Sequence, residues 1–167
     1  MTAAARPRLS TIDIAKHALN FSIAHFTIFS ATERENLHGH NFQVECSLTA
    51  PVNEDGLVFD YGIVKSIIRE LCDRLDEHVV LPTQSPFLSI EETEERVTAR
   101  FADEEIVFLR RDVLLLPIRN TTVEELSHWF LNQMLTHPDL SSRELTELIV
   151  RVSSSPGQSG SASWRAT

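Results

Sequence analysis

A long alternation of side-chain types constrains this chain more than any other feature of its sequence. From His38 to Ala50, histidines and apolar residues occupy every second position, and small or polar residues lie between them. Side chains of a β-strand point alternately to its two faces, so this run predicts a long strand with one buried face. An earlier alternation, from about Lys16 to Phe29, predicts a second strand in which three residues share one face: Phe21, Ile23 and His25.

Three histidines lie on the apolar side of these two predicted strands. His38 and His40 are two positions apart, so they point the same way, roughly 6–7 Å from each other along the chain. His25 is in the same phase on the preceding strand and would supply a third imidazole. Three neutral imidazoles with a vacant fourth position are typical of a catalytic zinc site. From spacing alone an alternative stays open, in which inward histidines are simply hydrogen-bonded within a core.

The remaining patterns predict two helices and further strands. Apolar residues recur at helical spacing from Asp60 to about Leu75, and residues 120–122 cap a second amphipathic helix. Residues 96–109 look like a hairpin whose turn lies at 103–105, and the segment from Leu148 to Val152 predicts another strand. This order predicts an α+β fold with helices packed on one face of an antiparallel sheet.

The chain length fits one domain, and we take residues 1–167 as that domain. Residues 1–15 are expected to be a loose N-terminal segment. Residues 156–167, which follow a serine-rich stretch, are expected to be either a loose tail or a link to a last short strand.

Composition narrows the classes of partner. The net charge is −9, which argues against nucleic-acid binding because that needs a basic face. No segment is long and apolar enough to span a membrane, and no apolar secretory signal is visible. The two cysteines, Cys46 and Cys72, lie in apolar runs without metal-type spacing and read as buried free thiols. These features predict a cytoplasmic protein.

Several motifs in order resemble the family of 6-pyruvoyl-tetrahydropterin synthase and 6-carboxy-tetrahydropterin synthase. They are FSIAHF, LHGHNF, GLVFDYGIVKSIIRELCDRLDEH, TTVEEL and VRVSSSPG. The resemblance implies a tunnelling fold (T-fold), with a four-stranded antiparallel sheet and two helices, assembled as a homohexamer of two trimers with active sites between subunits. It also implies a zinc ion bound by His25, His38 and His40, and a pterin substrate such as dihydroneopterin triphosphate. Zinc would act as a Lewis acid on the substrate hydroxyls.

Two proton-transfer positions depart from the family pattern. The family's usual base is a cysteine shortly before HGH, where this chain has ATEREN without cysteine; Glu35 matches a glutamate found there in one subgroup. A carboxylate can serve as general base for retro-aldol cleavage of dihydroneopterin, which releases 6-hydroxymethyl-dihydropterin. The alternative for Glu35 is a solvated loop charge. The family's Asp–His pair corresponds here to Asp76 with Glu77, and His78 follows one position later.

The substrate-binding positions are also altered. The pterin-anchoring glutamate of the last functional strand falls on Ser154, whereas Glu124 keeps a second pterin-contacting carboxylate, beside Thr122. Glu124 has an alternative role, because Thr121 and Glu124 have the spacing of a helix capping box. Residues 87–118 look like an insertion relative to the family's usual length. The hairpin within this segment would cover the site or extend the oligomer surface.

These features support three hypotheses for function. The first is zinc-dependent lyase chemistry on a dihydroneopterin-type pterin. The second is a repurposed homologue that binds a pterin-like ligand without the synthase reaction. The third is an aldolase-type variant that uses Glu35. The catalytic candidates are therefore Glu35, Asp76 and His78, and the substrate-binding candidates are Glu124, Thr122 and Ser154.

Overall fold

The structure, a computed structural model, describes residues 7–167 and is built on one large mixed sheet. The strands of this sheet follow the order β10-β9-β3-β2-β4-β8, and β1 pairs with β3 outside that path. Their bounds are β1 Leu9–Ile14, β2 Asn20–His25, β3 His38–Pro51, β4 His78–Pro82, β8 Val113–Leu116, β9 Glu147–Ser155 and β10 Gln158–Arg165.

The long strand β3 organises the sheet. Its first half pairs antiparallel with β2 and its second half with β1, so these two strands share one edge of β3. Strand β9 pairs antiparallel with the other edge, and β10 follows β9. The predicted antiparallel four-stranded unit is therefore present as β10-β9-β3-β2. Strands β4 and β8 extend it through parallel pairing, which the sequence patterns did not indicate.

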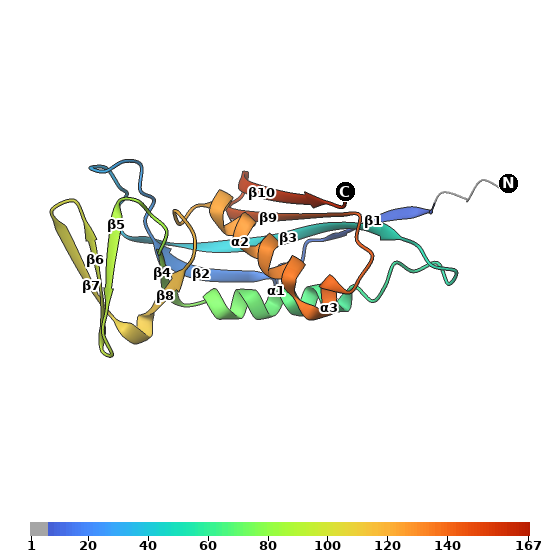
Figure 1. Cartoon of the computed structure of the whole chain (residues 1–167), viewed down its shortest axis with the longest axis horizontal. Coiled ribbons are helices and arrows are strands. Elements are labelled where there is room, and N and C mark those ends of the chain that lie inside the picture. Colours follow the sequence, from blue (N-terminus) through green and yellow to red (C-terminus); the bar gives the residue numbers. More distant parts are fainter. Residues whose placement is uncertain (1–6) are drawn as a thin grey trace.

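Helices cover one face of this sheet (Figure 1). Helix α1, Gly62–Leu75, packs over β2, while α2, Val123–Thr136, packs over β9 and β10; the short α3, Pro138–Ser141, follows α2. The buried side chains of the sheet and helices form the main hydrophobic core. Asp60 was expected to open the first helix. It precedes the helix instead, and its carboxylate accepts a hydrogen bond from the backbone N–H of Gly62 at 2.8 Å.

A second, three-stranded antiparallel sheet stands at the end of the molecule opposite β1 (Figure 1). It consists of β5 Leu88–Glu92, β6 Arg96–Phe101 and β7 Glu104–Leu109, and the one-turn helix η1, Arg110–Asp112, leads back to β8. It has its own apolar cluster, which includes Phe26 and Ile28 from the segment after β2. The predicted hairpin is confirmed, but its turn lies at Ala102–Asp103, where Ala102 takes a positive φ of 50°.

The two chain ends are more ordered than the sequence patterns indicated. Residues 9–14, expected to be loose, form β1, because Ile12 and Ile14 pack against the core edge of β3. Residues 158–165 form β10 in register with β9, which corresponds to the last strand that was one of the two expectations. Residues 1–6 of the expected loose segment lie outside the described residues. Within residues 7–167, no helix is long and apolar enough to cross a membrane.

Candidate metal centre and catalytic cavity

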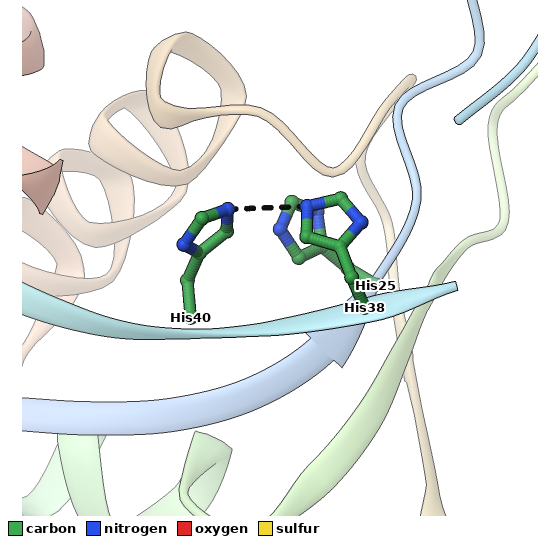
Figure 2. A group of neighbouring side chains, drawn as sticks. All are labelled: His25, His38 and His40. Carbon is green, nitrogen blue, oxygen red and sulfur yellow. Dashed lines mark hydrogen bonds between the residues drawn. The ribbon is translucent and has the colours of Figure 1, made fainter. Parts of the chain in front are cut away.

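Three imidazoles meet above the neighbouring strands β2 and β3. His25 is the last residue of β2 and pairs with His38, the first residue of β3, while His40 pairs with Ile23. Paired residues point to the same face of a sheet, so all three side chains rise toward the helix-covered side (Figure 2). One nitrogen from each ring lies within 4.8 Å of the others, which is close enough for one metal ion.

The hydrogen bonds of His25 fix its tautomer. Its Nδ1 lies 2.9 Å from the backbone carbonyl of Thr121, and a carbonyl can only accept, so Nδ1 carries the proton. The bare Nε2 is buried without a hydrogen-bond partner in the described part of the chain, on a residue that is only 5% exposed. Burial lowers the pKa of His25 below its ordinary 6.5, against the opposite effect of the Thr121 hydrogen bond, so the ring is neutral near pH 7. A buried, unpaired lone pair of this kind is what a metal ion requires.

His38 presents its Nε2 in the same way. Its Nδ1 donates to the backbone carbonyl of Asn36 at 2.8 Å, which leaves an Nε2 lone pair facing the other rings. The Nε2 atoms of His38 and His40 are 3.1 Å apart, marked by the dashed line in Figure 2. Two tetrahedral zinc ligands at about 2.0 Å from the ion would be about 3.3 Å apart, so the spacing fits. The donor set, three imidazoles without cysteine, is that of a site with an open position.

Glu35 lies beside this cluster, on the loop that joins β2 to β3. One carboxylate oxygen is 3.9 Å from Nε2 of His38 and accepts a hydrogen bond from the backbone N–H of Thr27 at 3.0 Å. The backbone N–H of Glu35 in turn donates to the Thr27 carbonyl at 2.9 Å. Partial burial raises the pKa of Glu35, but hydrogen bonding to Thr27 and the nearby imidazoles lower it more, so the pKa lies below 4.5. The group is therefore a carboxylate near neutral pH.

One cavity of about 290 Å³ brings most of the predicted site residues together. It is lined by the three histidines and Glu35, and also by Thr122 and Glu124 at the start of α2 and by Ser154 on β9. The cavity also contains residues that the sequence analysis missed: Thr27, Phe29 and Gln158. Thr27 acts through its backbone, which no residue pattern reveals, and Phe29 and Gln158 lie on segments whose path the sequence left open.

The capping interaction of α2 removes the alternative role of Glu124. The N-cap is Thr122, whose hydroxyl accepts from the backbone N–H of Glu125 at 3.3 Å. Glu125 in turn accepts from the backbone N–H of Arg119 at 2.8 Å. The expected capping box at Thr121 and Glu124 is therefore wrong by one residue, and Glu124 lines the cavity instead.

Asp76 and His78 lie apart from this cavity within one chain. The Asp76 carboxylate accepts from the backbone N–H of Ser22 at 2.6 Å, and Nδ1 of His78 donates to the Asp76 carbonyl at 2.7 Å. His78 lines a separate cavity of about 790 Å³, which shares only His40 and Ser154 with the first. Glu35 therefore lines the first cavity, whereas His78 lines the second and Asp76 lines neither of the two.

The fold and this three-histidine cavity define a pterin synthase-type protein, and comparison with known proteins agrees. The sequence model of the 6-pyruvoyl tetrahydropterin synthase family matches residues 14–163. The chain therefore belongs to the 6-pyruvoyl tetrahydropterin synthase family, and the T-fold prediction is confirmed.

Relatives of two kinds are similar to it. A protein of Methanocaldococcus jannaschii, described as a candidate 6-carboxy-5,6,7,8-tetrahydropterin synthase, is 32% identical over 70% of this chain and 71% of its own length. The 6-pyruvoyl tetrahydropterin synthase of Plasmodium vivax superposes with a TM-score of 0.88 at 32% identity, over 95% of this chain and 99% of that one. The Plasmodium falciparum protein of the same name gives a TM-score of 0.87 at 30% identity, with the same coverage.

Proposed function

We propose that this protein is a zinc-dependent lyase acting on dihydroneopterin triphosphate or a closely related pterin, with Glu35 as the general base. The observation that carries the proposal is the Glu35 carboxylate, held by Thr27 at 3.9 Å from Nε2 of His38 in the cavity of the three histidines. The usual cysteine is absent from this loop, so Glu35 is its candidate proton acceptor.

The metal would be held by Nε2 of His25 and by the facing nitrogens of His38 and His40. Zinc bound there would polarise the hydroxyl groups of the substrate side chain and make them more acidic. The protein's own contribution is orientation: carbonyls of Thr121 and Asn36 fix the ring tautomers so that the lone pairs converge.

The reaction that Glu35 favours is retro-aldol cleavage of the pterin side chain. The carboxylate removes the proton from the second hydroxyl of the side chain, and the bond between the first and second side-chain carbons breaks. The second carbon becomes an aldehyde, and the electron pair passes into the ring C=N bond. A proton returned to the first carbon then gives 6-hydroxymethyl-dihydropterin, so atoms and electrons balance.

Support for a glutamate base comes from the Plasmodium vivax protein. Two of its solved structures are described as catalytic-residue variants in which a glutamate is replaced by alanine or by cysteine. Each superposes on this chain with a TM-score of 0.88 at 31% identity. Since this chain has Glu35 at the cavity of the three histidines, we infer a catalytic role for it as well.

Binding of the pterin ring is assigned to the part of the cavity lining that comes from the start of α2 and from β9, which we call the ring-binding wall. Glu124 is the carboxylate able to accept from the ring N–H and amino groups, with Thr122 and Ser154 as neutral partners. Ser154 offers one hydroxyl where the family has a glutamate, so it cannot bind bidentately. We therefore place the main anchor on Glu124.

The second proton-transfer pair requires a neighbouring copy of the chain. His78 lines a separate cavity and Asp76 lines neither, so a complete site would combine this pair from one subunit with Glu35 and the histidines of another. The separate cavities support an oligomer with shared sites, and from the family resemblance we propose a homohexamer of two trimers, with sedimentation of the purified protein as the test. Two buried free thiols support a reducing, cytoplasmic location.

The decisive experiment is product analysis with dihydroneopterin and its triphosphate, together with zinc content. We expect 6-hydroxymethyl-dihydropterin and about one zinc per chain. Glu35→Gln should lower turnover roughly 10²–10⁴-fold and keep the zinc. Glu33→Gln is the matched control, because this exposed glutamate of the same loop lies outside the cavity lining.

Other outcomes identify the alternatives. Elimination of triphosphate, unaffected by Glu35→Gln, would assign synthase chemistry to another base and refute the proposal. Binding of the pterin without turnover would favour the repurposed homologue, a reading that Ser154 supports because the anchoring carboxylate is lost there. Protein that stays free of zinc when zinc is supplied would refute the metal site.

A further inference from the structure

Arg34 joins the loop that carries Glu35 to the inserted three-stranded sheet. Its guanidinium donates through Nη1 to the backbone carbonyl of Glu35 at 2.8 Å. Through Nε and Nη2 it binds the carboxylate of Glu104, at 2.8 and 2.5 Å, and Glu104 is the first residue of β7. One side chain therefore bridges the insertion and the residue that bears the proposed base.

The environment of this bridge makes it stronger than an ordinary surface ion pair. The Arg34 side chain is only 15% exposed, whereas Glu104 is 52% exposed. The guanidinium lies 5.0 Å from the ring centroid of Phe26 and 5.9 Å from that of Phe101, both buried in the second apolar cluster. Aromatic faces and partial burial reduce solvent screening of the arginine, and its planar fork fits several partners at once.

Within residues 7–167, the other hydrogen bonds of Glu35 itself both run to Thr27. Backbone and carboxylate contacts to Thr27 attach Glu35 to the segment that follows β2. Arg34 supplies the contact from the other side, where the insertion stands. With the Thr27 and Arg34 contacts both in place, the Glu35 carboxylate has little freedom. Without Arg34, the backbone carbonyl of Glu35 loses its link to β7.

We propose that Arg34 is a positioning residue for Glu35, and that the three-stranded sheet β5–β7, within the segment 87–118 expected to be an insertion, is the support against which Arg34 holds the loop. This assignment rests on the proposed role of Glu35 as the base. It gives the insertion a role different from the two that the sequence left open, which were covering the site and extending the oligomer surface.

The test is a set of variants of the full-length, zinc-loaded protein: Arg34→Gln, Glu104→Gln and the double variant. Misplacing a base by about 1 Å can cost up to about a hundredfold in rate, so Arg34→Gln should lower kcat about 10- to 100-fold. KM should change less than about twofold, because the ring-binding wall is untouched. Zinc content should stay unchanged, because the histidines lie on strands.

Glu104→Gln should cause a smaller fall in kcat, about three- to tenfold, because Arg34 keeps its contact with the Glu35 carbonyl. The double variant should be no slower than Arg34→Gln alone, because both changes remove one shared interaction. Arg100→Gln is the matched control: this arginine pairs with Glu91 and Glu105 within the same sheet and does not reach the loop. Its kcat should equal that of the unmodified protein.

A second readout does not depend on turnover. The backbone N–H of Thr27 donates to the Glu35 carboxylate, so its hydrogen exchange reports directly on the position of that carboxylate. Exchange across residues 27–36 should be about tenfold faster in Arg34→Gln and faster in Glu104→Gln, but unchanged in Arg100→Gln. Glu104 lies at the surface, so its variant should keep the fold even if Arg34→Gln does not.

Different variants test the positioning role of Arg34 and the proposed role of Glu35 as the base. If Glu35→Gln abolishes turnover while Glu104→Gln and Arg34→Gln match Arg100→Gln in kcat and exchange, the positioning role is overturned and the function stands. If Glu35→Gln leaves turnover intact, Glu35 is not the base and the proposed function is refuted. A lower kcat in Arg34→Gln would then have a cause other than the position of Glu35, and the positioning role would be refuted as well.

Discussion

The metal ligands and the proposed base are held by two regions of different construction. The three histidines lie on β2 and β3, in the middle of a sheet whose hydrogen-bond ladder sets their spacing. Glu35 lies on a loop that is held by a few backbone hydrogen bonds and by individual side-chain contacts. Metal binding and base placement are therefore separable, so single substitutions can remove one and keep the other.

The largest expected effect comes from the strand region. His38→Ala removes one of the three ligand nitrogens, and we expect zinc affinity to fall by more than about 100-fold and turnover to fall to background. Metal analysis after dialysis against a chelator, and the pterin product assay, measure both. His17→Ala, at an exposed histidine before β2, is the control and should retain zinc. Retention of zinc by His38→Ala would mean that the sheet does not provide the metal site.

The rigidity of the core formed by the large sheet and its helices has its own probe in the two thiols. Cys46 on β3 and Cys72 on α1 are buried, and burial raises the pKa of each from 9.0 to about 12. At pH 8 this lowers the thiolate fraction about a thousandfold, so iodoacetamide should label native protein at least that much more slowly than protein in denaturant.

The same pKa shift gives a sign for stability. A thiol whose pKa is higher in the folded state contributes stability that is complete below pH 9 and is lost as pH rises toward 12. Fast labelling at pH 8 without denaturant would show that the sheet core opens locally, and the contrast between strand and loop would then disappear.

The loop region has a second attachment that predicts a moderate effect. The Asn120 side chain accepts from the backbone N–H of Ile28 at 3.1 Å and donates to its carbonyl at 2.8 Å. Asn120→Ala leaves both backbone groups without these partners, so we expect a loss of about 1–2 kcal/mol in the free energy of unfolding. We also expect a several-fold lower kcat with unchanged zinc. Chemical denaturation and the product assay measure these, with Asn132→Ala on the exposed face of α2 as control.

The same contrast between the histidines on β2 and β3 and Glu35 on its loop explains which site residues the sequence could predict. Strict alternation on β2 and β3 placed three histidines on one face, and the structure brings them together because strand pairing follows from that periodicity. The base was predicted through family resemblance alone, since nothing in ATEREN indicates that Thr27 holds Glu35. The bridge from Arg34 to Glu104 joins residues 70 positions apart, and local patterns carry no signal for such contacts.

Other errors have local causes. The capping box was placed one residue early because two threonines stand side by side, and only backbone geometry shows that Thr122 is the N-cap. Parallel pairing of β4 with β2 and β8 was missed because short apolar segments at a helix end and after a hairpin do not reveal their partners. Asp76 and His78 follow a predicted helix end, but sequence alone does not show that His78 lines a cavity and Asp76 does not.

The smallest expected effect distinguishes the two roles of Thr122, which caps α2 and lines the cavity. Thr122→Ala removes the cap and should cost about 1 kcal/mol of folding stability, whereas Thr122→Asn keeps a capping oxygen and should cost only a few tenths. Both variants lose the hydroxyl, so KM for the pterin should rise about two- to tenfold in both if the hydroxyl binds substrate. A rise in KM confined to Thr122→Ala would instead show that Thr122 acts only by holding α2, and with it Glu124, in place. That result would mean that Thr122, like the histidines on β2 and β3, contributes through secondary structure, whereas Glu35 is positioned by contacts within its loop.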